Sequence, residues 1–513
     1  MTGKQLAKGA LLLTATGLIL RLIGFFYRIF QSNMIGNEGM GLLQLVSPVY
    51  SLILITMTSG LSVAVSKLTA QADEINGDPT RIIKAALRLV FLIGIPVGFI
   101  LFISSGVIAT HIIKDVRTLK SFRLIGLFLP LVATSSVLRG YFYGKNNVLP
   151  SSISQLAEQF AKVGTAIFIY GIMIPKGLEY ACLAAVIASI AGDLCSMAYL
   201  SIVLFVKPAP VRKSLSKGSS KKIMTNLIKI SIPVSVNKLI SSVLHTAEIV
   251  LIPRRLILSG LNYAQGMDLF GRFSGMALPL IMFPSIFTAS LATMLVPSIA
   301  KDMNKKDDEN LLAKISKSIQ LTMVIGFLFS AVFNSCAYEF GELLFAGKNV
   351  GEVIKILSWS CIFVYLNQTL SGIMSGLNKQ TAFMWNSMIG CVLRIIVVYF
   401  LIPIKGITVY VWGISISFAL TAVLNLYTIY KTTGTKFDFR KWVFKPALVF
   451  LAMHATGEYI TSLLSIMGIF GKFHLFIVIT GTALIGLMMM FGVGAISFRE
   501  TIFMLGIKKD RNS

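Results

Sequence analysis

The sequence has little charge, and acidic residues are the scarcest part of it. Charged residues make up 13% of the 513 residues, whereas soluble domains carry about 25%. Hydrophobic residues make up 55%, and the mean hydropathy is +0.79. This composition excludes a soluble enzyme, a secreted disulfide scaffold and a membrane anchor that carries a large soluble domain.

The sequence also lacks the motifs of hydrolytic enzymes. The stretch nearest to a P-loop, at 140–145, has the wrong spacing and no hydroxyl residue after its lysine, so we expect no ATP hydrolysis. No HExxH, no GxSxG and no clustered Cys and His occur. We therefore expect no enzyme, no metal site and no bound cofactor.

Cysteine is rare, and its placement favours structural roles. The count is odd, and no CxxC occurs. The cysteines lie in or beside apolar runs, which is typical of reduced cysteines in helices. They are Cys182, Cys195, Cys336, Cys361 and Cys391.

Long apolar runs fill most of the chain. A membrane-spanning helix needs about 20 apolar residues, so the runs predict an all-α integral membrane protein with about fourteen spanning helices. The first run carries Arg21 and Arg28 and is too long for a signal peptide, so we expect it to be retained as a helix. The expected spans are 6–33, 43–68, 86–110, 122–143, 152–174, 180–206, 224–252, 270–299, 314–338, 354–376, 381–402, 408–430, 444–466 and 472–495.

The net charge of +26 comes from 47 Lys and Arg against 21 Asp and Glu. In a multi-pass membrane protein, such residues gather in cytoplasmic loops beside anionic lipid, so we expect no nucleic-acid partner. With the N-terminus inside, about 29 Lys and Arg lie on the cytoplasmic side and about 11 on the other. The prediction is a multi-pass protein of the cell membrane with both termini in the cytoplasm. The basic outer segment at 114–123 runs against this rule and suggests contact with outer-leaflet lipid or substrate.

An internal duplication is visible at an offset of about 232 positions. The pattern at 140–146, Gly-x-x-x-Gly-x-Asn, recurs at 372–378, and Lys162 falls on Arg394. Each copy of the repeat holds six predicted helices. Because six is an even number, the copies are expected to form two pseudo-symmetric six-helix lobes of the same orientation, as in parallel-repeat transporters. Two such lobes form a central cavity and suggest alternating access. The predicted domains are an N-terminal lobe (1–206), a basic cytoplasmic linker (207–223), a C-terminal lobe (224–431), and two further helices with a tail (432–513).

Ionisable residues inside membrane helices are costly and mark candidate sites. Arg21 and Arg28 are seven residues apart and share one helix face with Gly17 and Gly24. Two guanidinium groups beside glycines suit an anionic ligand, because arginine binds phosphate through a planar fork. The alternatives are that Arg28 snorkels to the interface or pairs with Glu38.

The predicted seventh helix carries Lys238, His245 and Glu248 on one face. Lys238 is a candidate substrate-binding cation. His245 and Glu248 are candidates for proton relay or ion coupling. A structural polar seam between helices explains the same residues equally well.

The predicted fifth helix carries a polar face with Glu158 and Lys162. We count both as candidate substrate-binding residues, although their i,i+4 spacing also suits a structural ion pair within the helix. Arg272 is a weaker substrate-binding candidate, and Asp193 is a weaker ion-coupling candidate. Arg394 and the pair of His454 and Glu458 are weaker still.

Several motifs resemble those of the stage V sporulation protein B family, the polysaccharide-transporter type of the MATE-like flippase superfamily. Each motif alone is weak, but the order and spacing of the motifs along roughly residues 5–500 are specific to this family. They are RLIGFFYR at 21–28, IGNEGMG at 35–41, GLSVAVSKL at 60–68, RGYFYG at 139–144, QxxE at 155–158 with Lys162, IPRRL at 252–256, SGMALPLIMFP at 274–284 and LVPSI at 295–299.

The resemblance implies fourteen helices, in two six-helix lobes plus two, and export or flipping of lipid-linked saccharides. The related lipid II flippases have a similar Arg-x-x-Gly-Phe on their first helix and essential cavity arginines. Arg21 matches one of these arginines. The next one falls on Tyr27, with Arg28 one residue later. The second-lobe cavity arginine does not map cleanly onto Arg272. Glu248 stands where the stage V sporulation protein B family is expected to have Asp.

These lines together predict a flippase for undecaprenyl-pyrophosphate-linked saccharide, such as a lipid II-type peptidoglycan precursor, with spore cortex synthesis as a candidate role. Coupling to Na⁺, H⁺ or the membrane potential stays open, as does a partnership with cell-wall synthesis enzymes. One alternative is a cation-coupled multidrug antiporter, which needs an acidic cavity. The others are a glycosyl polymerase, which needs carboxylates near a sizeable outer loop, and a non-transporting scaffold.

Overall fold

The computed structural model describes residues 3–74, 78–206, 220–305, 308–345, 348–435, 437–468 and 472–492. Within these ranges every regular element is a helix, and no strand occurs. Most of the predicted linker at 207–223 and the tail after 492 lie outside the described residues.

The elements follow the predicted apolar runs. In chain order they are α1 (Gly3–Glu74), α2 (Pro79–Val107), η1 (Ile108–Ile113), η2 (Val116–Thr118), α3 (Leu119–Gly144), α4 (Val148–Met173), η3 (Ile174–Lys176), α5 (Leu178–Val206), α6 (Ser220–Leu258), α7 (Tyr263–Phe270), η4 (Gly271–Ala277), α8 (Leu278–Met282), α9 (Ser285–Lys305), α10 (Asp308–Ser335), α11 (Ala337–Phe345), α12 (Gly351–Leu357), α13 (Ser360–Gly376), α14 (Gln380–Ile396), η5 (Val397–Leu401), α15 (Ile402–Lys405), α16 (Ile407–Thr433), η6 (Arg440–Phe444), α17 (Lys445–Ile466) and α18 (Lys472–Gly492).

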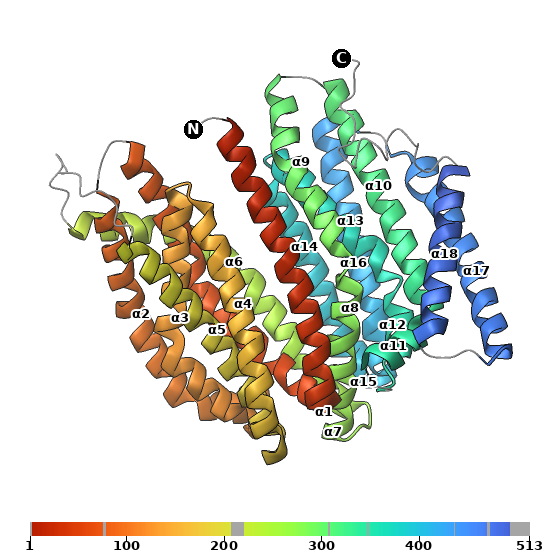
Figure 1. Ribbon diagram of the computed structural model, residues 1–513, viewed down its shortest axis with the longest axis horizontal. Helices are drawn as coiled ribbons and strands as arrows, with labels where there is room; N and C mark the ends of the chain where they lie inside the picture. The colour runs from red at the N-terminus through yellow and green to blue at the C-terminus, as the bar shows by residue number, and fades with distance from the viewer. Residues whose placement is uncertain are drawn as a thin grey trace. The chain divides into compact units, whose positions relative to one another are not determined.

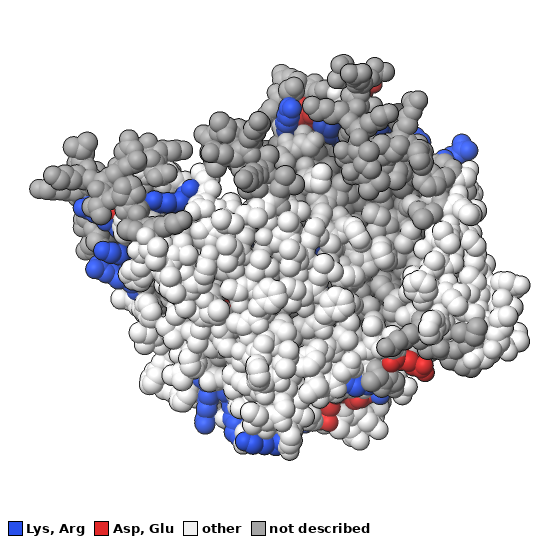
Figure 2. Space-filling model, viewed as in Figure 1, with Lys and Arg blue, Asp and Glu red and all other residues white. Residues whose placement is uncertain are grey.

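The described helices confirm a multi-pass membrane protein. Ten are long and apolar enough to span a bilayer, or twelve if each of two bent helix pairs crosses once. Each of the fourteen predicted spans has a helical counterpart, but the count of fourteen crossings is not confirmed. In Figure 2 the visible charged side chains gather towards the ends of the helices, and the surface between them is almost free of charge.

Helix α1 covers the first two predicted spans. A helix of this length extends about 100 Å at 1.5 Å per residue, which is far more than the bilayer core of about 30 Å. The helix breaks at Gly36, whose backbone has φ 76° and ψ 179°, a region that essentially only glycine adopts. The break falls in the gap predicted between 33 and 43, so the two spans are distinct segments of α1.

Helix α4 is the predicted fifth span, but it is not among the ten apolar helices. It has 26 residues, which is long enough to cross a bilayer core. Its polar face with Gln155, Glu158, Gln159 and Lys162 lowers its hydropathy. A helix of this kind is stable in a membrane only when that face is covered by protein or lines a polar cavity.

Packing divides the described chain into two compact units, which we call unit 1 (1–254 and 263–271) and unit 2 (255–262 and 272–513). Helix α6 packs with unit 1, and Thr246 donates a hydrogen bond of 3.3 Å to the carbonyl of Pro48 on α1. The packing boundary therefore differs from the lobe boundary that the repeat predicts at the linker. The lobe boundaries stay a prediction.

Two turns repeat at the predicted offset. Asn146 has φ 55° and Asn378 has φ 56°, and three backbone hydrogen bonds around each turn join equivalent residues at an offset of 232. A Cβ built on Gly140 would lie 2.5 Å from the carbonyl oxygen of Ser62, and one on Gly372 would lie 2.5 Å from that of Ala292. The same close helix approach therefore occurs in each unit, which supports the duplication.

Each unit has its own hydrophobic core. In unit 1, α1, α2, α3, α5 and α6 contribute buried aliphatic side chains around Tyr141 and Phe142. In unit 2, α9, α10, α13, α16 and α17 enclose the buried Trp442 and Phe450. Helices α17 and α18, which the repeat leaves over, lie side by side (Figure 1).

Candidate functional site

A cluster of ionic and polar side chains lies among the helices of unit 1. Arg139 of α3 forms an ion pair with Glu158 of α4 and donates a hydrogen bond of 2.9 Å to the Ser196 hydroxyl of α5. Both charged side chains are partly buried, with 21% and 30% of their surface exposed. Three helices are thus connected through one guanidinium group.

A second carboxylate belongs to the same cluster. The Tyr50 hydroxyl of α1 donates a hydrogen bond of 3.0 Å to Asp193 Oδ2 of α5. Asp193 interacts electrostatically with Glu158, Arg139 and Lys162. Helices α3, α4 and α5 therefore bring four charged side chains of unit 1 together, and α1 adds the Tyr50 hydroxyl.

Lys162 joins this cluster to the first half of α1. It interacts electrostatically with Arg28, Asp193 and Glu158, and its Nζ lies 5.5 Å from the ring centroid of Tyr27. We call Arg28, Arg139, Glu158, Lys162 and Asp193 the ionic cluster.

A group of uncharged, hydrogen-bonded polar side chains adjoins the ionic cluster. Gln31 donates a hydrogen bond of 2.6 Å to the Tyr170 hydroxyl, and the Tyr27 and Tyr170 hydroxyls lie 3.5 Å apart. Tyr27 and Gln31 are buried. The hydrogen bond from Gln31 to Tyr170 holds the part of α1 that also carries Arg28 against α4.

The ionic cluster holds three cations and two carboxylates. One carboxylate is paired with Arg139, and the other accepts a hydrogen bond from Tyr50. Arg28 and Lys162 form no ion pair among the described residues. An anionic group such as a phosphate would supply the missing negative charge.

The structure places the predicted site residues in four separate positions. Arg28, Glu158, Lys162 and Asp193 lie together in unit 1. Arg21 lies two turns before Arg28 on α1 and is exposed. Lys238 and His245 of α6 are exposed, whereas Glu248 of the same helix is 3% exposed. Arg272 lies in η4 of unit 2 and is partly buried.

Two expected pairings differ from those in the structure. Glu158 pairs with Arg139 instead of with Lys162 one turn away, because α3 brings a guanidinium group to the same face. Glu38 pairs with Arg117 and not with Arg28. Both carboxylates therefore have their partners on other elements. The i,i+4 pair of His454 and Glu458 does form, at 3.4 Å, and Glu458 is largely exposed.

Sequence reasoning missed Arg139 and Tyr50 as members of the site. Arg139 is an ionisable residue near the end of an apolar run, so the rule that singled out the other cations would have found it. Tyr50 carried no such signal, because tyrosine is common in membrane helices. Only the approach of α1 to α5 identifies it.

The basic segment that runs against the loop-charge rule has acidic partners in the structure. Arg117 pairs with Glu38 at 2.7 Å and with Asp115 at 2.8 Å. Lys120 lies 3.5 Å from Glu179 and donates a hydrogen bond of 2.9 Å to the Tyr180 hydroxyl. Much of the local positive charge is therefore neutralised within unit 1.

Asp115 lies between two spans and bonds to residues of η2 and α7. It accepts hydrogen bonds from Arg117 and, at 2.7 Å, from the Tyr263 hydroxyl of α7. Burial raises the pKa of this carboxyl, but the hydrogen bonds from Arg117 and Tyr263 outweigh it and hold the pKa below its usual range. Asp115 therefore links η2 to α7 through hydrogen bonds to its carboxylate.

The described part of the chain contains no group of three or more His, Cys, Asp or Glu residues placed to hold a metal ion. The five cysteines are all free thiols, and Cys195 is the exposed one.

Known proteins are similar to this chain in sequence and in fold. The polysaccharide biosynthesis protein family matches residues 6–303, more than half of the chain. This chain belongs to that family. The lipid II flippase MurJ family matches residues 276–481.

Individual relatives agree with the family match. The chain is 27% identical over 457 residues to stage V sporulation protein B of Bacillus subtilis, covering 88% of each chain. A structure of lipid II flippase MurJ in an inward closed conformation matches with a TM-score of 0.68 at 12% identity, covering 96% of this chain and 100% of that one. An inward-facing multidrug resistance MATE family transporter of the MOP superfamily matches with a TM-score of 0.65 at 14% identity, covering 82% and 98%.

These comparisons confirm the expected family resemblance and the MATE-like helical fold. They identify the chain as a multi-pass membrane transporter of the flippase type, since the second matching family, a Bacillus subtilis relative and the similar structures are named as flippases or transporters. Such a protein moves its substrate and changes no covalent bond.

Proposed function

We propose that this chain flips an undecaprenyl-pyrophosphate-linked saccharide, of the lipid II type, across the cell membrane. The observation that carries the proposal is the ionic cluster, in which Arg28 and Lys162 lie close enough to interact electrostatically and neither forms an ion pair with a described residue. A pyrophosphate matches this excess of positive charge. The match to the lipid II flippase family supports the same substrate class.

In this proposal the saccharide and pyrophosphate travel through a polar path while the polyprenyl tail stays in the lipid, along α17 and α18. Arg28 and Lys162 hold the pyrophosphate, with Arg21, Lys238 and Arg272 as further contacts along the path. The two lobes related by the repeat alternate in access to the two sides. Partner enzymes of cell-wall synthesis would supply and use the lipid.

The reset of the transporter requires a driving force, which we assign to H⁺, Na⁺ or the membrane potential. Asp193 is the best-placed group for cation coupling, because Tyr50 orients it within the ionic cluster. His245 and Glu248 on α6 are the other candidates. In proteoliposomes, Asp193→Asn should abolish the response to the coupling-ion gradient but retain lipid binding. An unchanged response would remove Asp193 from this role.

The deciding experiment measures headgroup translocation in proteoliposomes. Purified protein is reconstituted with labelled lipid II, which a leaflet-specific probe scores. Wild type should transport, and Arg21→Ala with Arg28→Ala should reduce the rate at least tenfold, because each arginine supplies a charge-assisted contact of about 1.5–3 kcal/mol. Lys176→Ala with Lys405→Ala removes the same charge from exposed sites and should leave the rate unchanged. Transport that survives in the arginine variant would contradict the cationic path.

A second candidate is a cation-coupled multidrug antiporter, which Glu158 and Asp193 favour because carboxylates attract cationic drugs. The fold of the MATE relative is compatible with it. The same proteoliposomes, loaded with a fluorescent cationic dye, distinguish the two. Dye export without lipid II transport would support the antiporter and reject the flippase.

A further inference from the structure

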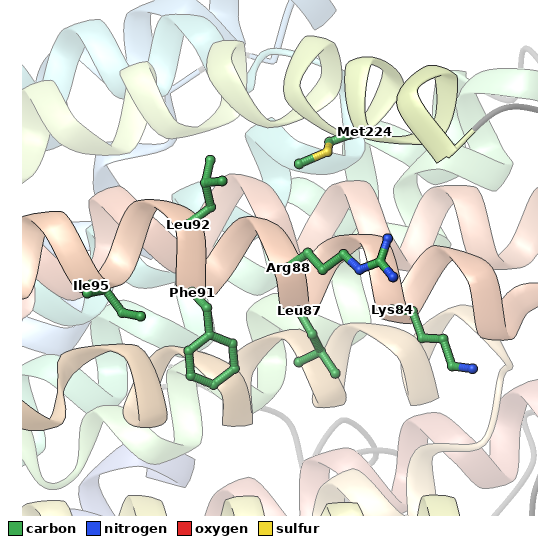
Figure 3. Close-up of a pocket in the computed structure, with 7 residues that line it drawn as sticks. All are labelled: Lys84, Leu87, Arg88, Phe91, Leu92, Ile95 and Met224. Atoms are coloured by element: carbon green, nitrogen blue, oxygen red, sulfur yellow. The ribbon is translucent and has the colours of Figure 1, made fainter.

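An open groove of about 590 Å³ runs along the surface of unit 1 where α2 meets the beginning of α6. Successive turns of α2 line one side of the groove, and Met224 of α6 lines the other side (Figure 3). The groove shares no residue with the ionic cluster. It is therefore a separate feature of unit 1.

One end of the groove is cationic. Lys84 and Arg88 lie one helical turn apart, and both are exposed. Figure 3 places them towards the same end of the groove. No described residue forms an ion pair with either, whereas Arg81, one turn earlier, lies 3.6 Å from Asp78. Two cations on one face are thus available to an external anion.

The rest of the groove is apolar. Phe91, Leu92 and Ile95 continue the lining from Arg88, and 64% of Leu92 and 58% of Ile95 is exposed. In a helix that crosses the membrane, this exposed apolar face contacts lipid chains. One face of α2 therefore presents a cationic surface that suits a lipid headgroup, followed by an apolar surface that suits an acyl chain.

The length of the groove corresponds to one leaflet. From Lys84 to Ile95 the helix rises about 16 Å at 1.5 Å per residue. Half of a bilayer core of about 30 Å is about 15 Å. A molecule with an anionic headgroup and a chain as long as one leaflet matches both dimensions.

We propose that this groove is a binding site for an anionic glycerophospholipid of the leaflet at the Lys84 end of α2. Its phosphate lies between Lys84 and Arg88, and one acyl chain lies along Leu92 and Ile95. A polyprenyl carrier is the less suitable occupant, since its longer tail overruns a groove one leaflet deep.

The position of the site gives the lipid a structural effect. The acyl chain contacts both α2 and Met224, so a bound lipid bridges α6 to the rest of unit 1. A ligand that binds the folded state raises stability in proportion to its occupancy. We therefore expect anionic phospholipid to stabilise the protein more than zwitterionic phospholipid does.

The test measures lipid retention by the purified full-length protein, using native mass spectrometry and thermal unfolding. Dioleoylphosphatidylglycerol and dioleoylphosphatidylcholine are the two probes. Wild type should retain the anionic lipid and gain thermal stability from it. Lys84→Gln with Arg88→Gln should weaken that binding by about tenfold or more, because both cations attract the anionic headgroup.

Two further variants control for charge and for the apolar part. Lys176→Gln with Lys405→Gln removes two exposed cations elsewhere and should retain the anionic lipid as wild type does. Leu92→Trp keeps both cations but fills the groove, and should lose the lipid. Equal retention by the Lys84 and Arg88 variant, equal binding of both lipids, or retention in the Leu92 variant would each overturn the proposal. So would displacement of phosphatidylglycerol by a lower concentration of undecaprenyl phosphate, which would assign the groove to the carrier.

Discussion

At the scale of single residues, the charges of unit 1 act in combinations that cross between helices. Arg139 contacts Glu158 and Ser196, while Tyr50 orients Asp193. A carboxylate removed from water requires such partners, because an unpaired buried charge is strongly destabilising. The same pairing leaves Lys162 and Arg28 for an anion.

The Arg139–Glu158 pair should have a measurable coupling energy. Arg139→Met leaves Glu158 partly buried without its cation and should lower the free energy of unfolding by about 1–3 kcal/mol. Glu158→Gln in the same chain should restore part of that loss. Thermal unfolding of the four proteins of this double-mutant cycle measures the coupling. Strictly additive losses would mean that the pair contributes no stability.

Asp115 gives an acid-dependent contribution to stability. Its pKa is lowered in the folded protein, so its contribution is present above the unfolded value of about 3.9 and is lost as pH falls through the folded value. Asp115→Asn should therefore be less stable than wild type at pH 7, and the difference should shrink below about pH 4. Unfolding measured from pH 7 to pH 3 tests this. A difference that stays constant across that range would exclude ionic stabilisation by Asp115.

At the scale of elements, one glycine decides that α1 forms two spans instead of one. Gly36 adopts φ 76° and ψ 179°, and Asn37, the next residue, approaches Gly271 so closely that a Cβ there would lie 1.9 Å from the Asn37 carbonyl oxygen. The break therefore sets the start of the second half of α1 against Gly271, which belongs to the same unit.

Gly36→Ala should destabilise the protein by about 1–3 kcal/mol, because an L side chain is strained in this backbone region. Gly17→Ala in the first half of α1 is the matched control. Its Cβ meets nothing within 4 Å and its backbone is helical, so it should be neutral or slightly stabilising. Unfolding in one detergent compares the two. Equal stability of both variants would show that the break does not depend on glycine.

At the scale of the whole molecule, the duplication organises the chain. The turns at Asn146 and Asn378 have the same backbone geometry and the same hydrogen bonds. The polar interiors of the units nevertheless differ. Unit 1 has the ionic cluster, whereas Asn425 of unit 2 bonds Asn367 at 3.0 Å and Asn386 at 2.9 Å in an uncharged amide network. The repeated fold therefore encloses a charged cluster in unit 1 and an uncharged amide network in unit 2.

The predicted orientation can be tested with single cysteines in a variant without the five native ones. Lys176→Cys, between α4 and α5, should react with an impermeant maleimide in intact cells. Lys431→Cys, at the end of α16, should react only after permeabilisation, because both termini are predicted inside. The reverse pattern would invert the topology, and labelling of both sites from outside would contradict an odd number of spans between them.

The sequence by itself determined the class, the helices and the family. Apolar runs fix helices in a bilayer, because every backbone polar group must be paired within its own segment. Gly140 and Gly144 with Asn146 revealed the duplication. Ionisable residues in apolar runs identified Arg28, Glu158, Lys162 and Asp193, because such residues are costly in a membrane.

Only the tertiary structure decided which of these residues are neighbours. Glu158 had a possible partner one turn away, yet α3 supplies Arg139. The basic segment at 114–123 had no visible counter-charge in the sequence, and only the structure places Glu38, Asp115 and Glu179 beside it. Tyr50 became a site residue only through α5. Helical periodicity specifies the face on which a residue lies, whereas the partner of that face depends on how distant segments pack.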